Sequence, residues 1–200
     1  MKKRNPILSI VCLLILCGIG FYIFSAGAAK AEITINGKTY EMRTISVRDF
    51  MSDGYVFSTM SVEGNTMYTY NYSNAVLEAK SYYNSGVPFK VKGSAGASIT
   101  CWVYNPTSEQ VEIREGKVSS ISCDIRDLLA EGVKVSVVGL EMERQTKAEI
   151  KSYMDDTLKG YTYSENEDVN AISYTKGQVS YTFTFDDDDI LKNAIARNNV

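Results

Sequence analysis

Histidine is absent from the 200-residue chain. Without an imidazole, the sequence cannot supply a Ser-His-Asp triad, a Cys-His pair or a histidine metal site. Paired carboxylates of the glycosidase kind remain, but nothing in the sequence brings two of them to one cleft. We therefore expect no enzymatic activity, no cofactor and no bound metal, and rank a hydrolase third among the functions considered.

Clusters of basic residues are also absent beyond Lys2, Lys3 and Arg4. When these three are left out of the 21 Lys and Arg residues, 18 remain against 24 Asp and Glu, a net charge of −6. An acidic surface repels phosphate backbones, so nucleic acid is excluded as an expected partner.

The one long apolar run, residues 7–29, follows these basic residues and carries no charge. Its length suits a membrane-spanning helix, which needs about 20 residues, better than a signal-peptide core of about 7–15. The small residues of "SAGAAKA" (25–31) also fit a cleavage site, and "LILC" ending at Cys17 gives a weaker lipoprotein alternative. We expect residues 1–31 to be a signal anchor or signal peptide. The protein is then single-pass in the cell membrane through residues 7–29 with its C-terminal part extracytoplasmic, or secreted if cleaved.

Only two cysteines, Cys101 and Cys123, lie outside the apolar run. Each cysteine lies on the same face of a predicted strand as the apolar residues two positions before and after it. Both thiols are therefore expected to point toward the protein core. In an oxidising compartment such a pair is predicted to form a disulfide. The alternative is two separate buried thiols, which pack as small apolar groups.

The stretch "EMRTISVRDF" (41–50) recurs as "EMERQTKAEI" (141–150). Ser46 with Asp49, and Thr146 with Glu149, fit capping boxes that open amphipathic helices. A second partial repeat, "EGKVSSISCDI" (115–125) and "KGQVSYTFTF" (176–185), predicts a turn followed by an alternating strand in each copy. The alternative is coincidence, since capped helices are common.

These patterns predict an α+β fold: an N-terminal transmembrane helix, then two unequal units of short helix plus antiparallel β-sheet, at residues 32–130 and 131–200. The first unit has 39 extra residues, expected between about 56 and 96. Asn36-Gly37 predicts a type I′ hairpin ahead of the first helix.

A family resemblance follows from "ITINGKTYEM", "SVRDFMSDGY", "ITCWVYNPTSE", "GKVSSISCDI" and "ISYTKGQVSYTFTFDDDD". In this order they resemble secreted or membrane-anchored proteins of Gram-positive bacteria. The C-terminal part is similar to the helix-plus-sheet repeats of β-lactamase-inhibitor proteins and of small outer-membrane assembly lipoproteins. The resemblance implies a non-enzymatic binding or assembly role, and no inhibitor contact residue carries over by position.

Residues 186–189, "DDDD", form the most conspicuous charged run. They are expected to make a solvated turn before a last strand at about 191–197. The alternative is a calcium site, although the spacing of an EF-hand loop is missing.

Tyrosine is in excess, with 14 in the chain, and several fall in the insert. Aromatic residues with polar tips are favoured in interfaces, whereas ordinary half-buried sheet packing is the alternative. The candidate partner surface consists of Tyr68, Tyr70, Tyr72, Tyr82, Tyr83 and Trp102. The first functional hypothesis is a surface protein that binds another protein, as an inhibitor or assembly factor. The second is a module that binds cell-wall glycan or a small ligand through the tyrosine-rich insert.

Overall fold

The computed structural model describes residues 30–58, 60–63, 66–69, 72, 74–83, 85–94, 96 and 98–199, with the backbone alone for 60–63 and 66–69. Over these residues the fold is α+β, built mostly of antiparallel sheets with three short α-helices. None of the helices in these ranges is long and apolar enough to cross a membrane. The predicted anchor at residues 7–29 lies outside the described residues.

Two sheets hold most of the strands. The larger has eight, in the order β13 (Thr162–Asn166), β14 (Ala171–Lys176), β15 (Val179–Phe185), β16 (Leu191–Asn198), β10 (Lys117–Asp124), β8 (Ile99–Tyr104), β7 (Val87–Val91) and β3 (Tyr55–Phe57). The smaller has four, in the order β12 (Leu140–Met142), β11 (Val135–Val137), β1 (Glu32–Ile35) and β2 (Lys38–Glu41). Two short pairs join β4 (Met60–Glu63) to β5 (Thr66–Thr69), and β6 (Val76–Leu77) to β9 (Val111–Glu112).

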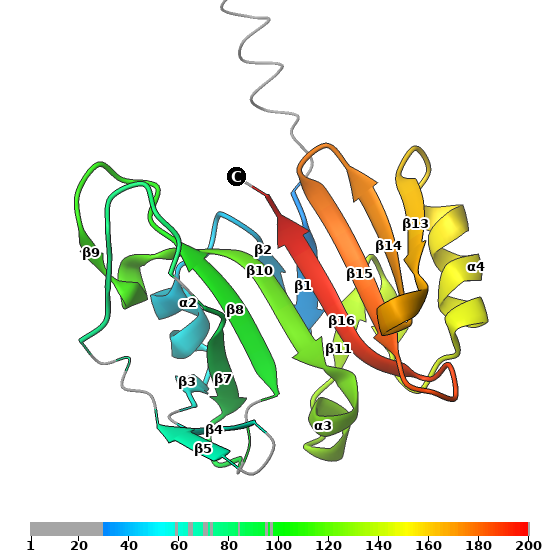
Figure 1. Ribbon diagram of the computed structural model, residues 1–200, viewed down its shortest axis with the longest axis horizontal. Helices are drawn as coiled ribbons and strands as arrows, with labels where there is room; N and C mark the ends of the chain where they lie inside the picture. Colours follow the sequence, from blue (N-terminus) through cyan, green and yellow to red (C-terminus); the bar gives the residue numbers. More distant parts are fainter. Residues whose placement is uncertain are drawn as a thin grey trace, which may run out of the picture.

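The helices are α2 (Val47–Ser52), α3 (Ile125–Ala130) and α4 (Lys147–Thr157), with two 3₁₀ turns at Ile113–Glu115 and Glu167–Val169. The four-stranded sheet packs on one face of the eight-stranded sheet, so that β1 and β11 lie behind β16 in Figure 1. Phe50 of α2 contacts Tyr40 of β2, and Tyr153 of α4 donates to the carbonyl of Val138 beside β11. Both helices therefore lie on the same side as the small sheet, and the other face of the large sheet carries no layer of described helices or strands.

The strand order shows an internal two-fold repeat. Outward from the boundary between β10 and β16, the large sheet runs β10-β8-β7-β3 on one side and β16-β15-β14-β13 on the other. The small sheet is arranged alike, with β1-β2 beside β11-β12. Each half thus reads hairpin, helix, then four strands of the large sheet, and the doubled stretch marks the same place in both halves.

Both predicted capping boxes are confirmed. The Ser46 hydroxyl accepts from the backbone N–H of Asp49, and the Asp49 carboxylate accepts from the N–H of Ser46 at 2.8 Å. Thr146 and Glu149 make the same reciprocal pair, again with an N–H to carboxylate distance of 2.8 Å. These bonds satisfy amides that a helix start otherwise leaves without partners. Below each box the core residue is aromatic or aliphatic, Phe50 in α2 and Ile150 in α4, both fully buried.

Both small-sheet hairpins turn through left-handed backbone. Asn36 and Gly37 have φ of 50° and 79°, which confirms the predicted type I′ turn. Val138 and Gly139 take 51° and 83° at the equivalent turn of the second half. A β-branched residue rarely adopts this conformation, so the sequence did not signal the second hairpin.

The second partial repeat does not join equivalent strands. It aligned β10 with β15, whereas the sheet order makes β16 the counterpart of β10 and β8 the counterpart of β15. Backbone contacts agree, because the bridge of Ser46 to Lys117 at the start of β10 matches that of Thr146 to Ile190 ahead of β16. The shared Gly-x-Val-Ser therefore reflects two similar turns and not equivalent positions in the two halves. Turns that lead into a strand with alternating faces commonly use these residue types.

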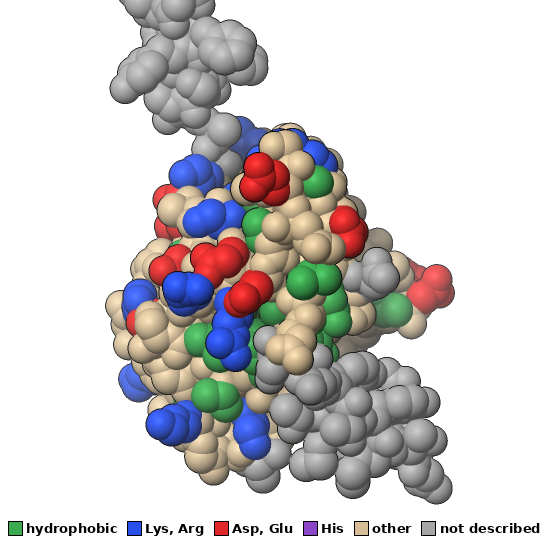
Figure 2. All heavy atoms as spheres, turned by 90° about the vertical axis from the view of Figure 1, so that its left-hand side faces the viewer, with side chains coloured by type: hydrophobic (Ala, Val, Ile, Leu, Met, Phe, Trp, Pro, Cys, Tyr) green, Lys and Arg blue, Asp and Glu red, His purple; other side chains and the backbone are tan. Residues whose placement is uncertain are grey.

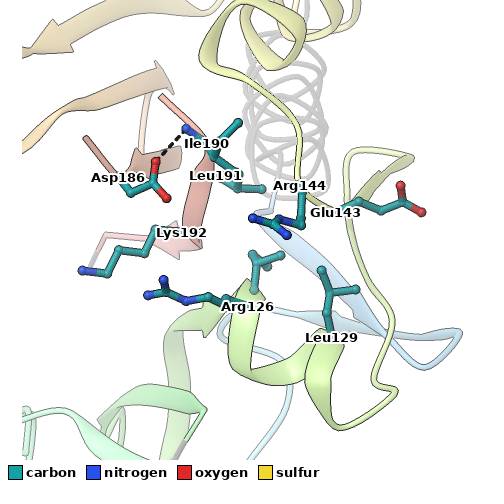
Figure 3. Close-up of a pocket in the computed structure, with 9 residues that line it drawn as sticks. Arg126, Leu129, Glu143, Arg144, Asp186, Ile190, Leu191 and Lys192 are labelled. Atoms are coloured by element: carbon teal, nitrogen blue, oxygen red, sulfur yellow. Dashed lines mark hydrogen bonds between the residues drawn. The ribbon is translucent and has the colours of Figure 1, made fainter. Parts of the chain in front are cut away.

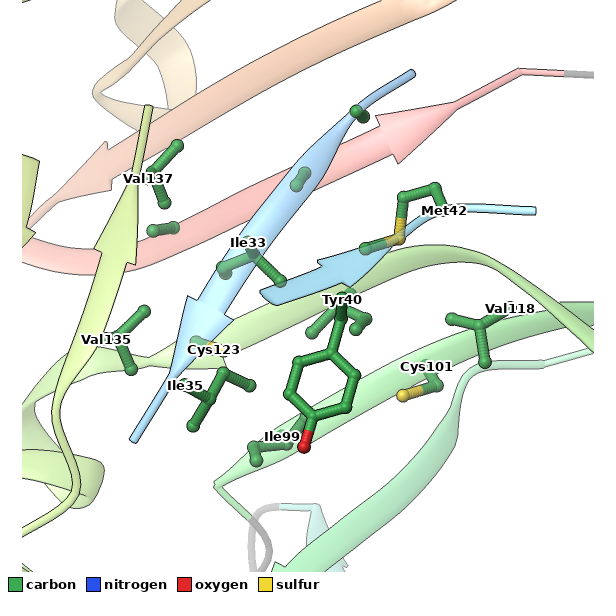
Figure 4. Packing of buried hydrophobic residues seen from close by; sticks show 14 of the residues in the cluster. Ile33, Ile35, Tyr40, Met42, Ile99, Cys101, Val118, Cys123, Val135 and Val137 are labelled. Atoms are coloured by element: carbon green, nitrogen blue, oxygen red, sulfur yellow. The ribbon is translucent and has the colours of Figure 1, made fainter. Parts of the chain in front are cut away.

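One hydrophobic core crosses the boundary between the predicted units at residue 130. Ile33 and Ile35 of β1 and Tyr40 of β2 face Ile99, Cys101 and the other inward residues of the large sheet (Figure 4). Because β10 and β16 pair along their lengths and both sheets draw strands from each half, neither half has a separate core.

The predicted disulfide is not present, because the strand register separates the two cysteines. Both are buried, free thiols in the core (Figure 4). Cys101 of β8 lies opposite Ile121 of β10, and Cys123 lies opposite Ile99. The cysteines are therefore diagonal neighbours, at about 7–8 Å, whereas a disulfide needs Cα atoms within about 6.8 Å. Inward alternation was read correctly from the sequence, but it could not reveal a register offset by two residues.

The insert of the first half lies between β3 and β7, within the predicted range. The sequence allowed a helix over "SNAVLEAKSYY" (73–83), but its described residues form turns and the short strand β6. Figure 2 looks at the side of the molecule that carries α2, where Lys and Arg side chains lie among Asp and Glu side chains. At the end of α2, Asp53 pairs with Lys38 at 2.6 Å.

Candidate functional site

The uncovered face of the large sheet, called the open face below, is rich in hydroxyl side chains and carries few charges. Inward residues of its strands alternate with outward ones, so the cross-strand register defines the outward set. That set includes Thr100, Trp102, Ser120, Ser122, Asp124, Ser173, Thr175, Ser180, Thr182, Thr184, Asn193, Ile195 and Arg197. Within it Asp124 and Arg197 are charged, and Lys90 of β7 faces outward by the same alternation. The hydroxyls bond sideways, as Ser122 does to Asn193 and Ser173 to Thr182, each at 2.9 Å.

At one end of the open face, an aromatic ring and a guanidinium meet above a buried hydroxyl. Ser120 of β10 lies between Trp102 of β8 and Arg197 of β16, directly opposite both in the ladders. The Arg197 guanidinium stacks over the Trp102 ring at 5.6 Å. Ser120 is 1% exposed, and its hydroxyl has no hydrogen-bond partner among the described residues. A buried, unpaired hydroxyl is unfavourable, which marks this place as one that an external acceptor can complete.

A β-bulge shapes the backbone here. The register of β10 on β8 shifts between Val118 and Ser120, so Ser119 is the extra residue. The Ser119 hydroxyl donates to the carbonyl of Trp102 at 3.1 Å and fixes the bulge. Bulges re-aim side chains at sheet ends, and this one brings Ser119 beside Trp102.

Two adjoining hollows open at this end and share Tyr82 as a wall. The first, of about 230 Å³, is lined by Tyr82, Trp102, Ser119, Arg197, Asn198 and Asn199. The second, of about 290 Å³, is lined by Arg43, Lys80, Ser81, Tyr82, Tyr104, Asn105 and Pro106. Together they are called the Tyr82 groove. Neither set of lining residues contains a carboxylate.

The walls of the groove are held by backbone and ring contacts. Tyr82 forms a bridge with Tyr104, extending the end of β8, and their rings lie 5.7 Å apart. The Arg43 guanidinium lies 5.8 Å from the Tyr104 ring and donates to the Tyr104 hydroxyl at 3.2 Å. Arg43 also donates to Gln178 at 3.0 Å, so the turn between β14 and β15 supports it. These contacts hold the side chains of Arg43 and Tyr104 in fixed orientations at the wall of the groove.

The predicted aromatic surface is only partly assembled. Tyr82 is 45% exposed, and Trp102 is half-buried on the open face; these two line the groove. Tyr72 is 3% exposed and packs on Phe57 and Tyr83, so its prediction as partner surface is wrong. Tyr83 is half-buried against the same core and lines neither hollow.

The remaining two tyrosines of the predicted surface are not placed by side chain. Tyr70 lies outside the described residues, and Tyr68 is described only by its backbone, paired with Ser61 in the ladder of β5 with β4. The expectation of a tyrosine stripe along "MYTYNY" (67–72) therefore stays a prediction for these two residues.

The sequence analysis missed the two arginines of the groove. Arg197 alternates with Ala194 and Ala196, which was a signal that it faces away from the core. Nothing in the sequence placed Arg43 beside Tyr104, because the turn after β2 reaches the end of β8 only in the folded chain.

Another hollow, of about 30 Å³, lies between α3 and the start of β16. Figure 3 shows Arg126 and Lys192 extending in the same direction at its rim, with Arg144 close to Leu191. A hollow of this volume has room for about one or two water molecules. It is therefore too small for a ligand.

The acidic run forms the predicted turn. The Asp186 carboxylate accepts from the backbone N–H groups of Asp188 and Ile190 at 3.1 and 3.0 Å, and Asp189 has a φ of 58°. Throughout the described ranges, no group of three or more Cys, Asp or Glu residues is arranged to hold a metal ion.

The remaining reactive groups serve packing and pairing. Burial raises the pKa of the Cys101 and Cys123 thiols, which disfavours the nucleophilic thiolate. Between α4 and the sheet, Lys151 pairs with Asp155 at 2.5 Å, and Tyr174 donates to the same carboxylate at 2.7 Å. Each charge there has a partner, so this network attaches α4 to β14.

Comparison with known proteins adds no relative: no family model matches the chain, and neither a curated protein nor a solved structure is significantly similar to it.

Proposed function

We propose that this chain is a non-enzymatic extracytoplasmic binding protein that holds a protein partner on the open face, with residues 7–29 as its membrane anchor. The observation that carries the proposal is the clustering of Trp102, Tyr82 and Arg197 beside a broad, hydroxyl-rich sheet face. Trp, Tyr and Arg are the residue types enriched at the energetic centres of protein interfaces.

The composition of the open face favours association at low cost. Short hydroxyl side chains lose little conformational freedom when a partner covers them. Hydroxyl side chains outnumber charged ones in the outward set, so few ions need to be desolvated. Many of the hydroxyls already pair sideways within the sheet, as Ser173 and Thr182 do.

The test is retention of a protein by the immobilised full-length chain from solubilised cell envelopes. Thr182→Arg places a bulky charge in the middle of the open face, and Lys159→Glu, at a 73%-exposed side chain beyond α4, is the matched control. We expect the same protein to be retained by the wild type and the control and lost with Thr182→Arg. Equal retention by all three, with unchanged melting temperatures, would show that the open face is not the binding surface.

A glycan ligand is the second candidate, favoured by the hollow of about 230 Å³ in which Tyr82 and Trp102 lie beside Asn198 and Asn199. Flat rings next to amide side chains suit sugar rings and their hydroxyls. Protease treatment of the envelope separates the two: a glycan would still be retained afterwards, whereas a protein partner would be lost.

A further inference from the structure

We infer that the Tyr82 groove binds an acidic peptide segment of the partner, with its carboxylates at Arg43, Lys80 and Arg197. The inference rests on the proposed function and adds the chemistry of the partner's contact segment. It is carried by the charge pattern of the groove, by the geometry of its arginines and by the buried hydroxyl of Ser120.

The three cations of the groove have only neutral partners within the described residues. Arg43 donates to a tyrosine hydroxyl and a glutamine, Lys80 to the carbonyl of Pro106, and Arg197 stacks on an indole ring. Elsewhere many cations pair with carboxylates: Lys30 with Glu41, Lys38 with Asp53, Arg48 with Glu115, Lys134 with Glu141, Lys147 with Glu165, Lys151 with Asp155 and Lys159 with Asp156. In a chain whose exported part has a net charge of −6, an uncompensated positive groove is a local reversal of charge.

The two arginines are held in place before any ligand arrives. Each guanidinium lies against an aromatic ring, Arg43 at 5.8 Å from Tyr104 and Arg197 at 5.6 Å from Trp102. A planar guanidinium with a fixed orientation presents paired N–H donors that match a carboxylate. Less side-chain entropy is lost on binding than for a free surface arginine, so affinity is gained by pre-organisation.

Ser120 supplies an independent observation at the same place. Its hydroxyl is buried without a partner between Trp102 and Arg197, on the same side of the sheet. Because Ser120 lies directly opposite Arg197 in the ladder, a carboxylate held by Arg197 on the open face lies next to this hydroxyl. The hydroxyl then gains an acceptor, which removes the cost of its burial.

A peptide fits better than a phosphate polymer or a lipid headgroup surface. The outward residues of β14 and β15 that pair across their ladder carry no cation, so a polyanion running from the groove toward them would lose its charge partners. A polypeptide that continues from an acidic segment finds instead the hydroxyls of Ser180 and Thr182, which can bond its backbone.

The experiment uses the chain's single tryptophan, Trp102, as a reporter inside the groove. Full-length protein in a non-ionic detergent is titrated with acetylated, amidated hexaglutamate, with hexaserine as the uncharged probe, while its fluorescence is recorded. We expect saturable binding of hexaglutamate alone. It should weaken by about tenfold or more in the double variant Arg43→Gln/Arg197→Gln, since each lost charge-assisted bond matters. The control Arg126→Gln/Lys192→Gln removes two cations at the rim of the small hollow in Figure 3, and should change affinity less than about twofold.

Three outcomes would overturn the inference. Equal weakening in the control variant would mean unspecific attraction by net charge. Tighter binding of inorganic polyphosphate than of hexaglutamate, lost in the same groove variant, would assign the groove to phosphate polymers. No response to hexaglutamate, while the partner is still retained by the wild type and lost with Thr182→Arg, would leave the proposed function standing and refute the acidic segment. Lys80→Gln alone repeats the test with an exposed side chain whose loss does not endanger folding.

Discussion

Replacing Phe50 by alanine is expected to lower the free energy of unfolding by about 3–5 kcal/mol, the usual cost of removing a buried phenylalanine. Phe50 is fully buried below the first capping box. Its ring stacks on Tyr55 at a centroid distance of 4.3 Å and meets Tyr40 and Phe89 edge-on at 5.1 Å each. The upper part of the range is expected, because three aromatic contacts are lost together with the buried area.

The magnitude follows from how the three neighbours are held. Tyr40 belongs to β2, Tyr55 to β3 and Phe89 to β7, so the cavity borders both sheets and cannot close by moving one element. For a chain of this size each 1 kcal/mol shifts the melting temperature by about 2–4 °C, which gives a decrease of about 6–20 °C. Total stabilities of about 5–15 kcal/mol make this a large fraction of the whole.

The assay is equilibrium unfolding in urea followed by far-UV circular dichroism, with Arg48→Ala as the control in the same helix. Arg48 pairs with Glu115 at the surface, where its side chain is 66% exposed, so its loss should cost less than about 1 kcal/mol. A loss below 1 kcal/mol for Phe50→Ala, or one equal to that of the control, would refute the aromatic cluster as the junction of α2 with the two sheets.

Other perturbations test the cysteines, the insert and the first capping box. Cys101 and Cys123 are expected to react with iodoacetamide once the protein is unfolded, with no reductant needed, as measured by intact mass. If alkylation required a reductant, the disulfide hypothesis would be correct after all. Tyr72→Ala is expected to lower the melting temperature by several degrees, because that side chain is buried, and unchanged stability would return it to the surface. The backbone N–H and hydroxyl of Ser46 hold the pKa of Asp49 below its usual range, so this stabilisation is present above an unfolded-state pKa of about 4 and is lost as the pH falls through the lower folded-state pKa. Urea titrations between about pH 5 and pH 3 should therefore show a smaller loss of stability for Asp49→Asn than for the wild type, and parallel curves would contradict the capping box.

Local structure was predictable where a residue's own chemistry decides it. Asn36-Gly37 adopts the predicted turn because both residues tolerate positive φ. The capping boxes formed because a hydroxyl and a carboxylate three residues apart satisfy each other's amides. Strand alternation correctly sent Cys101 and Cys123 inward.

The candidate site was only half predictable. Tyr82 and Trp102 were singled out for their residue type, and they do line one groove. Tyr72 was singled out for the same reason and lies in the core, because burial of an aromatic ring depends on what packs over it. Arg43 and Arg197 are separated by most of the chain, and no local pattern links them to one groove.

The sequence by itself determined the class of the fold, the turns, the helix starts and the alternation of strand faces, since each depends on residues within a few positions of one another. The tertiary structure decided which strands became neighbours. Pairing of β16 with β10 joins the two halves into one sheet, and together with the pairing of β10 with β8 it sets Trp102, Ser120 and Arg197 in one row. The register of β10 on β8 offsets the two cysteines, which are free thiols. Register between distant strands depends on how two hydrophobic faces fit together, and that fit is a property of the packed core rather than of any one segment.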